Sequence, residues 1–275
     1  MNDRSGAVTT SAAARRREIG MLLQSGHLSV TELASRFEIS TSTIRRDLAA
    51  LSGQGRILRT YGGALDVAVS NEQGVAERAR QAVREKHAIG RAAAQHVHEG
   101  DFLLLDAGTT VGAFAKVLAQ GAMPVTCVTN GITSMRALLP CQQIQTLFVG
   151  GLIRHLSQGT VGPFAEQMVG SLTATSVFLS ADGVVGQLGL CERAPEQIAL
   201  KRLMVERSDN VYVLADSRKL GSREGSHFWL GMTRPWTLST DDGATSEQLA
   251  PFCEDPLATV ELAAVVHDPA GALSD

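Results

Sequence analysis

The chain has 275 residues, a formal net charge of −3 and four cysteines, a length that suits one small and one larger domain. Its cysteines show no CxxC or other metal-ligand spacing, which excludes a disulfide scaffold and predicts neither a metal nor a cofactor. No apolar run reaches the ~18 residues that a membrane helix needs, so the sequence predicts a soluble, cytoplasmic protein.

Charge is divided unevenly along the chain. Residues 1–65 contain nine Arg and five Asp or Glu, a net of +4, whereas the remaining 210 residues have 16 basic and 23 acidic side chains, a net of −7. A basic head on an acidic body indicates a nucleic-acid-binding domain joined to a domain with another task. Residues 1–14 are polar and lack the apolar core of a signal peptide, which predicts a disordered tail.

Residues 15–65 predict three helices followed by a hairpin. One apolar stripe at helical spacing is formed by Val30, Leu33, Ala34 and Phe37. Ser29 with Glu32 three residues later is a capping box, which starts this helix. An upstream helix at about residues 14–24 closes the core with Ile19, Leu22 and Leu23.

The next helix carries the expected contact surface. Its core stripe consists of Ile44, Leu48 and Leu51, with Ser40 or Thr41 as the N-cap. Its opposite face holds small residues and arginine, which suit the major groove of double-stranded DNA. A strand before Gly62 then predicts a wing that follows the DNA backbone. The expected DNA contacts are Thr41, Ser42, Thr43, Arg45, Arg46 and, on the wing, Arg59. The alternative is an ordinary helical hairpin with a solvated basic face.

The body of the chain alternates short apolar runs with helical patterns. A charged linker is predicted at 66–83, with a partly helical linker as the alternative. A second domain at 84–265 opens with a helix at about 84–98, and a tail is predicted at 266–275. Strands are predicted at 102–105, 125–128, 146–149, 177–179 and 211–214, with helices at 111–119 and 132–139. This alternation predicts a mainly parallel, Rossmann-like α/β sheet with helices on both faces. Residues 222–256 show no interpretable motif and predict closing structure.

Polar residues follow the predicted strands, at the edge where ligands of such sheets bind. These segments are Asp106–Thr110, Thr129–Gly131, Gly150–Gly151, Asp182–Gly183 and Asp216–Lys219. A helix follows the first of them, so Gly108 and the hydroxyls of Thr109 and Thr110 predict an anion site at a helix N-terminus.

Further polar residues would complete this site. Arg154 with Lys201 or Lys219 adds positive charge, and Asp106 and Asp182 accept hydrogen bonds from sugar hydroxyls. Two alternatives remain open: the DAGTT segment only caps a helix, and Lys219 is a solvated loop residue. DxGTT also occurs in sugar kinases, where it turns between antiparallel strands. The helical spacing of residues 111–119 argues against that interpretation.

The pattern LxxRFxISxxTIRRDLxxLxxxGxIxRxxGGA, which starts at Leu33, resembles the winged helix-turn-helix of the DeoR family of bacterial transcriptional regulators. TIRRDL and the trailing GGA stand at the spacing of the family. Glu38 occupies a turn where the family usually has glycine, and at positive φ it would cost about 1 kcal/mol.

The body from Glu85 to about Ala263 resembles the DeoR sensor domain, in segments that include DAGTT, VTN, VGG, ADG, LKR and DSRK. That domain is related to ribose-5-phosphate isomerase, so the resemblance implies a ribose-phosphate-isomerase-like fold that recognises a phosphorylated sugar. The expected effector-binding residues are Asp106, Gly108, Thr109, Thr110, Asn130, Gly151, Arg154, Asp182, Lys201 and Lys219. Departures from the family's GLTT region, which leave the effector open, are Cys191, Glu192 and Ala199.

A sugar-phosphate isomerase is the alternative function. Its chemistry needs a carboxylate base and charged help for the enediolate, and the isomerase relatives carry a DGADE-like segment and a KGGGG loop. This chain reads ADGV from Ala181 and has no KGGGG, so we expect no enzyme and no catalytic residue. The sequence predicts a nucleoid-associated repressor of a sugar-metabolism operon, which binds operator DNA as a homo-oligomer and responds to a phosphorylated sugar.

Overall fold

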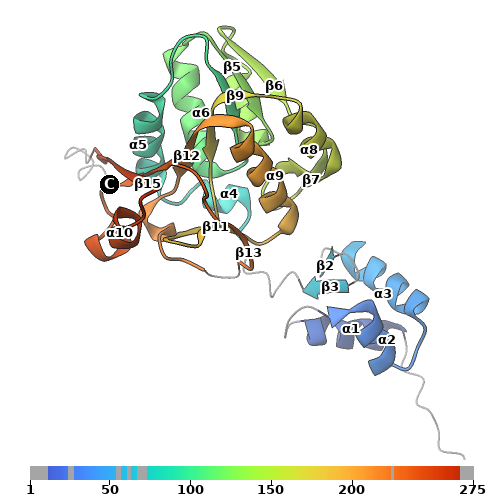
Figure 1. The fold of residues 1–275 in the computed structure, drawn as a ribbon. Helices are drawn as coiled ribbons and strands as arrows, with labels where there is room; N and C mark the ends of the chain where they lie inside the picture. Colours follow the sequence, from blue (N-terminus) through green and yellow to red (C-terminus); the bar gives the residue numbers. More distant parts are fainter. Residues whose placement is uncertain are drawn as a thin grey trace, which may run out of the picture. The chain divides into compact units, whose positions relative to one another are not determined.

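The computed structural model describes residues 12–23, 28–53, 57–60, 63–66, 73–223 and 226–266, with only the backbone of 21, 23, 28, 52–53, 57–60 and 63–66. The chain divides into two compact units, Met1–Glu72 and Gln73–Asp275 (Figure 1), and each is described by itself. Among the described residues, no helix combines the length and the apolar character needed to cross a bilayer. The predicted tail at 1–14 is described only from residue 12, where the first helix begins.

The first unit is a three-helix fold with a small antiparallel sheet. Its elements are α1 (Ala12–Leu23), β1 (Leu28–Ser29), α2 (Val30–Arg36), α3 (Thr41–Gly53), β2 (Ile57–Thr60) and β3 (Gly63–Asp66). The strands lie in the order β1-β3-β2, and β2 with β3 forms the predicted hairpin. The core consists of Ile19, Leu33, Ala34, Ile44, Leu48 and Leu51, with Val30 and Phe37 packed against it. The stripes predicted on α2 and α3 are confirmed; on α1, Ile19 is in the core, Leu22 is half-buried and the side chain of Leu23 lies outside the described residues.

The starts of α2 and α3 are set by serine. Ser29 caps α2 through the predicted capping box, with Glu32 N–H donating to Ser29 Oγ at 3.1 Å and Ser29 N–H donating to Glu32 Oε2 at 2.7 Å. Ser40, rather than Thr41, caps α3, because its Oγ accepts from Thr43 N–H at 3.2 Å. Glu38, in the turn between α2 and α3, has a φ of 53°, which confirms the positive φ considered for this position.

A seven-stranded parallel sheet forms the centre of the second unit. The strand order is β15-β14-β12-β9-β4-β5-β6, and every neighbouring pair is parallel. The strands are β4 (Phe102–Leu105), β5 (Val125–Thr129), β6 (Ile144–Phe148), β9 (Ala174–Leu179), β12 (Ser208–Leu214), β14 (Trp236–Asp241) and β15 (Ala258–Ala263). Five of them lie where strands were predicted.

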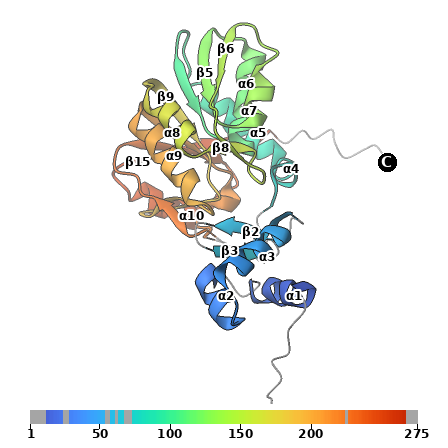
Figure 2. The same ribbon diagram turned by 90° about the vertical axis from the view of Figure 1, so that its right-hand side faces the viewer.

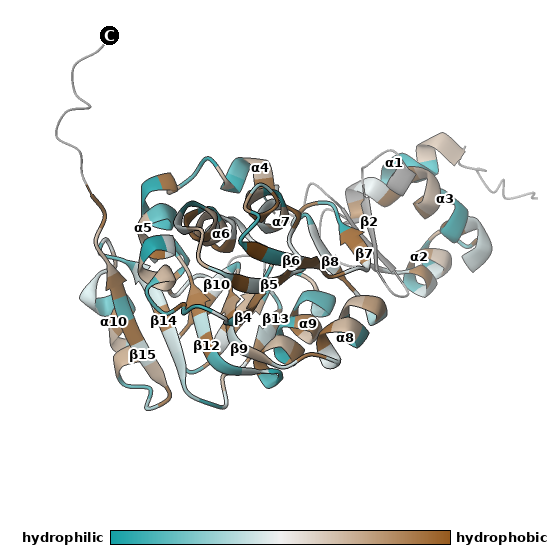
Figure 3. Cartoon of the chain, turned by 90° about the horizontal axis from the view of Figure 1, so that it is seen from above, coloured by the Kyte–Doolittle hydropathy of each residue, from teal (hydrophilic) through white to brown (hydrophobic). Residues whose placement is uncertain are grey.

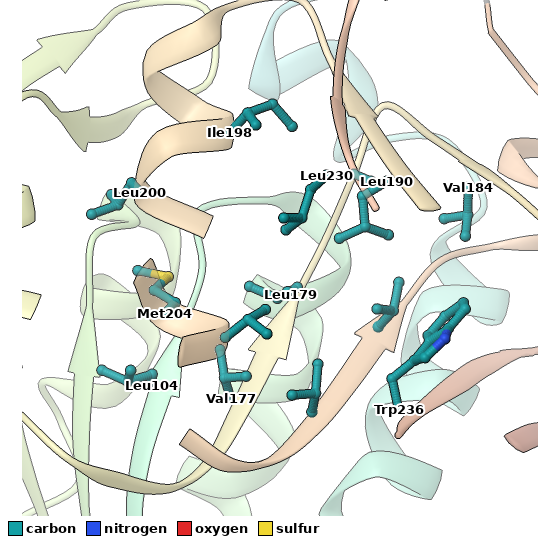
Figure 4. Packing of buried hydrophobic residues seen from close by; sticks show 14 of the residues in the cluster. Leu104, Val177, Leu179, Val184, Leu190, Ile198, Leu200, Met204, Leu230 and Trp236 are labelled. Carbon is teal, nitrogen blue, oxygen red and sulfur yellow. The ribbon is translucent and has the colours of Figure 1, made fainter. Parts of the chain in front are cut away.

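A layer of helices covers each face of the sheet (Figures 1 and 2). The layers are α5 (Val83–Ala94), α6 (Thr109–Gly121) and α7 (Ile132–Leu138) on one face, and α8 (Pro163–Gly170) and α9 (Pro195–Glu206) on the other. Successive residues of a strand face opposite sides, so Leu103 and Leu105 pack with α5 and α6, whereas Leu104 packs with α9. Figure 4 shows Leu104 beside Met204 of α9, and parts of β5 and β6 are drawn in hydrophobic brown in Figure 3.

Three further groups of elements complete this unit. β10 (Gly183–Val185), β11 (Gly189–Glu192) and β13 (Phe228–Leu230) form a small antiparallel sheet, and β7 (Leu152–Arg154) pairs with β8 (Gly159–Val161). α10 (Ser246–Cys253) precedes β15, and the turn η1 (Ser217–Lys219) follows β12. Residues 222–256, for which no motif was interpretable, therefore contain β13, β14 and α10.

A short helix, α4 (Val75–Arg78), lies within the stretch 66–83 that was predicted as a linker. Val75 is buried, and its N–H donates to Leu156 O at 3.0 Å. The second unit therefore begins at residue 73, earlier than the predicted residue 84. Four residues of α4 carry only one large apolar side chain, which is too little for periodicity to reveal a packed helix.

Candidate functional site

The outer face of α3 is the candidate DNA-binding surface. Ser42, Arg45 and Arg46 are exposed on it, while Thr41 and Thr43 are half-buried at its start. The hydroxyl of Ser40 lies 2.8 Å from Ser42 Oγ and 2.9 Å from Thr43 Oγ1, so these hydroxyls also stabilise the first turn of α3. The backbone of Arg59 lies in β2, paired with Ala64, and its side chain is outside the described residues.

Asp47 is a structural residue of this unit that sequence reasoning missed. Arg15 Nε donates to its Oδ2 at 2.6 Å and Arg16 Nε to its Oδ1 at 2.8 Å, which joins α3 to α1. Burial acts to raise the pKa of Asp47, but the hydrogen bonds and charges of the two arginines outweigh it and lower the pKa. The sequence does contain a sign of this structural role. Asp47 follows Ile44 by three residues and therefore lies beside the core stripe of the helix.

The second candidate site lies at the carboxyl ends of the central strands. Asp106 directly follows β4, and Ser180 and Asp182 follow β9, the neighbouring strand. Asp106 Oδ2 accepts from Ser180 N–H at 3.1 Å and from Ser180 Oγ at 3.4 Å. The two strand ends that the sequence placed on one rim are therefore joined directly.

Lys201 of α9 occupies the centre of a buried charged cluster. It forms ion pairs with Asp106 and with Glu192, the latter at 3.0 Å, and donates to Ser180 O at 2.7 Å. Gln197 Nε2 donates to Glu192 Oε2 at 3.0 Å. Burial raises the pKa of Glu192 to about 7, because one ammonium cannot neutralise two buried carboxylates. Burial acts to lower the pKa of Lys201, but Asp106 and Glu192 raise it.

The start of α6 provides hydrogen-bond donors for an anion. Gly108 is its N-cap, and no side chain caps the helix. A Cβ on Gly108 would lie 1.9 Å from Ser180 Oγ, so glycine is required by the close approach of two strand ends. Thr109 and Thr110 form the first turn, and Thr110 Oγ1 is buried without a hydrogen-bond partner among the described residues. Free amides and the helix dipole at such an end favour a negatively charged group.

Asn130 and Gly151 connect the neighbouring hairpin to this rim. Asn130 follows β5, and its Nδ2 donates to Thr160 O at 3.0 Å, while Oδ1 is buried without a partner in the described part of the chain. Gly151 has a φ of 150° and comes so close to β8 that a Cβ would lie 2.8 Å from Val161 O. Arg154 ends β7 on the same hairpin and is half-buried.

Cationic side chains surround Asp182. Arg78 NH1 lies 3.0 Å from Asp182 Oδ1, and Arg193 Nε lies 3.8 Å from Oδ2. Lys219 donates to Ala181 O, which contradicts the alternative of a solvated loop residue. Burial lowers the pKa of Lys219. Sequence reasoning missed Arg78 and Arg193, because only the folded chain brings them to the strand end.

The arrangement offers both kinds of hydrogen-bonding group that a phosphorylated sugar needs. Donors lie at the start of α6 and on the arginines, and the carboxylate of Asp182 can accept from hydroxyls. Contacts bring Asp106, Gly108, Asp182, Lys201 and Lys219 together around the end of β9. Asn130 at the end of β5 and Gly151 before β7 both contact β8 of the adjoining hairpin. Residues 109–121 form a helix, which rules out the kinase-like turn between strands. The described residues contain no cluster of three potential metal ligands.

Both units match known protein families. Residues 15–77 match the family described as DeoR-like helix-turn-helix domain, and residues 81–232 match the DeoR C terminal sensor domain.

Similar proteins extend over most of the chain. An uncharacterized HTH-type transcriptional regulator of Bacillus subtilis is 35% identical over 73% of this chain and 77% of its own length. A putative aga operon transcriptional repressor of Escherichia coli O157:H7 is 31% identical over 90% of this chain and 93% of its own. The lactose phosphotransferase system repressor of Streptococcus mutans is 30% identical over 78% and 86%.

Among solved structures, ribose 5-phosphate isomerase A of Methanocaldococcus jannaschii superposes on 49% of this chain and 52% of its own, with 14% identity and a TM-score of 0.36. A similarity of this size carries no argument about activity.

Proposed function

Because this chain belongs to the DeoR family of transcriptional regulators, we propose that it represses an operon of sugar metabolism under the control of a phosphorylated sugar. The relatives are named regulators and repressors, so the family is regulatory, and the isomerase alternative is set aside. One relative is named for a lactose phosphotransferase system, which supports a sugar-related operon. The single observation that carries the effector proposal is the close approach of the start of α6, at Gly108, to the end of β9, where Ser180 and Asp182 follow the strand.

The DNA contacts are proposed for the exposed face of α3. Arg45 and Arg46 are exposed, and arginine at such a position can donate two hydrogen bonds to guanine or bind phosphate. Thr41, Ser42 and Thr43 at the start of α3 and Arg59 on the wing complete the proposed contacts. A phosphosugar bound in the second unit would favour one of two arrangements of the protein, with a coupling of about 1–3 kcal/mol.

Fluorescence anisotropy on DNA from upstream of the protein's own gene tests both parts. The titration is repeated with sugar phosphates, the matched free sugars and inorganic phosphate, at fixed salt because phosphate contacts make affinity salt-dependent. Specific binding that one phosphorylated sugar changes is the expected result. Specific binding that ignores every sugar phosphate would leave the regulator and refute the effector chemistry.

Two variants assign the surfaces. Arg46→Ala is expected to lose about 10- to 100-fold in specific affinity and to keep effector binding. Arg17→Ala removes the same charge from an exposed position of α1 and should keep both the operator affinity and the effector binding.

Thr110→Val preserves the shape of the side chain and is expected to bind the operator normally but to lose the response to the effector. Thr146→Val is its matched control, because Thr146 Oγ1 also has no hydrogen-bond partner among the described residues but lies within β6. Normal operator affinity in Arg46→Ala would show that α3 does not read the groove.

A further inference from the structure

Arg78 joins the proposed effector site to the segment that leads from the DNA-binding unit. It ends α4 and lies between the two family matches, which end at residue 77 and begin at residue 81. Because α4 precedes α5 and the whole sheet, it is the first element of the second unit along the chain. α4 is therefore the element of the second unit that lies nearest in sequence to the DNA-binding unit.

The Arg78–Asp182 ion pair connects α4 with the end of β9. Arg78 NH1 donates to Asp182 Oδ1 at 3.0 Å, across 104 residues of sequence, and the two side chains are only 17% and 12% exposed. Arg78 Nε has no hydrogen-bond partner among the residues described. The guanidinium is thus held at the site with an N–H group still able to donate to a ligand.

The turn after α4 is maintained by tertiary contacts. Lys86 Nζ donates to Arg78 O at 2.6 Å and to Gln81 O at 2.9 Å. Ala82 has a φ of 47°, a left-handed conformation that alanine rarely adopts. This corner between α4 and α5 does not follow from local preference, so loss of a contact that holds α4 can change it.

We propose that Arg78 is an effector-binding residue and that it transmits the occupancy of the site to α4. This inference rests on the proposed function and adds its route of regulation. An anionic group of the effector competes with Asp182 for the guanidinium, since phosphate forms the same charge-assisted hydrogen bonds as a carboxylate. Ligand binding then replaces the Arg78–Asp182 pair, and the positions of α4 with and without this pair are the two states that the effector distinguishes.

The test compares Arg78→Ala with Arg80→Ala in the full-length protein. Arg80 is exposed, carries the same charge and lies two residues away, so it controls for electrostatic effects on DNA. Operator affinity is measured by anisotropy without ligand and with the sugar-phosphate panel, and hydrogen exchange is followed at the amides of residues 75–80. Asp182→Asn, which removes the charge of the partner and keeps its shape, provides a second way to release α4.

Arg78→Ala and Asp182→Asn are expected to exchange faster at α4 than the wild type and Arg80→Ala. Without ligand, Arg78→Ala should shift operator affinity about 5- to 150-fold, the range of typical allosteric couplings, and its response to the effector should fall below twofold. Wild-type operator affinity together with a full response in Arg78→Ala would overturn the proposal.

The same experiment separates this proposal from the proposed function. If the wild type binds its operator and ignores every sugar phosphate, the effector chemistry fails. In that case the operator affinities measured without ligand still test whether Arg78 transmits a change through α4. A shift of operator affinity in Arg78→Ala that is absent in Arg80→Ala supports this transmission. Equal ligand-free affinities of Arg78→Ala, Arg80→Ala and the wild type would overturn it.

Discussion

Lys201 has all three N–H donors engaged inside the second unit. Its acceptors are Asp106 Oδ2, Glu192 Oε1 and Ser180 O, and all belong to residues that are buried. Buried charges are tolerated only when they are paired and hydrogen-bonded. Lys201 therefore has a structural role beside the proposed site, and it can donate to a ligand only if one of these hydrogen bonds is broken.

Glu192 should make stability depend on pH. Its pKa is raised from 4.5 to about 7 in the folded chain, so the folded state binds the proton more tightly than the unfolded state. The resulting stabilisation is complete below pH 4.5 and is lost as the pH rises to 7. One pKa unit corresponds to about 1.4 kcal/mol, so the free energy of unfolding of the wild type should fall on the order of 3 kcal/mol over this pH range. Glu192→Gln should not show this decrease.

Urea unfolding between pH 4.5 and 8 measures this difference. Glu196→Gln is the control, because Glu196 is exposed on the same segment and should retain the wild-type pH profile. A Glu192→Gln profile parallel to that of the wild type would show that this carboxyl does not titrate in the range.

The conformation of Glu38 predicts a stabilising substitution. At a φ of 53° a residue with a Cβ is strained, and glycine is not. Glu38→Gly should therefore raise the free energy of unfolding of the first unit by about 1 kcal/mol. Glu38→Ala keeps the Cβ and should give no such gain in the same thermal-unfolding measurement, so equal effects of the two substitutions would exclude strain as the cause.

At the level of elements, α3 has two functions on opposite faces. Ile44, Leu48 and Leu51 are buried in the core, while Arg45 and Arg46 are exposed. Asp47 adds a third contact, because both of its carboxylate oxygens are bonded to arginines of α1. The orientation of the proposed recognition helix therefore depends on a polar anchor as well as on apolar packing.

Removal of that anchor should weaken the first unit. Asp47→Asn keeps the shape but loses the charge, and a buried hydrogen-bonded group that loses its partner costs about 1–3 kcal/mol. The pKa of Asp47 is lowered, so its contribution is present above the unfolded-state value and lost as the pH falls below it. Thermal unfolding of the first unit at pH 7 measures the effect, and Glu18→Gln, at an exposed position of α1, should leave the midpoint unchanged.

At the level of the whole molecule, the described residues form separate hydrophobic cores. The core of the first unit contains six buried apolar residues, while two larger clusters lie on the two faces of the sheet in the second unit. A small core buries less apolar surface and stabilises less.

Calorimetry of the full-length protein should therefore show two transitions, with the first unit unfolding at the lower temperature. A ligand stabilises only the unit that binds it, by about 2.7 kcal/mol at a concentration of 100 Kd. Operator DNA should raise the first transition and the sugar phosphate the second. A single transition that both ligands shift equally would contradict independent unfolding of the two units.

The amino-acid sequence alone determined the features that rest on local periodicity. The capping box at Ser29, the core stripe of α3 and five strands of the central sheet were predictable, because side chains repeat every 3.6 residues in a helix and every two in a strand. β14 was not, since its buried residues include Ser239, Thr240 and Asp241, and a polar strand has no apolar run to reveal it.

The tertiary structure decided which charged residues meet. The strand ends were predictable as a rim, because parallel strands present their carboxyl ends at one edge. The Arg78–Asp182 pair spans 104 residues and the Lys201–Asp106 pair spans 95. Pairing over such distances depends on how helices pack on the sheet, and no local pattern contains that information.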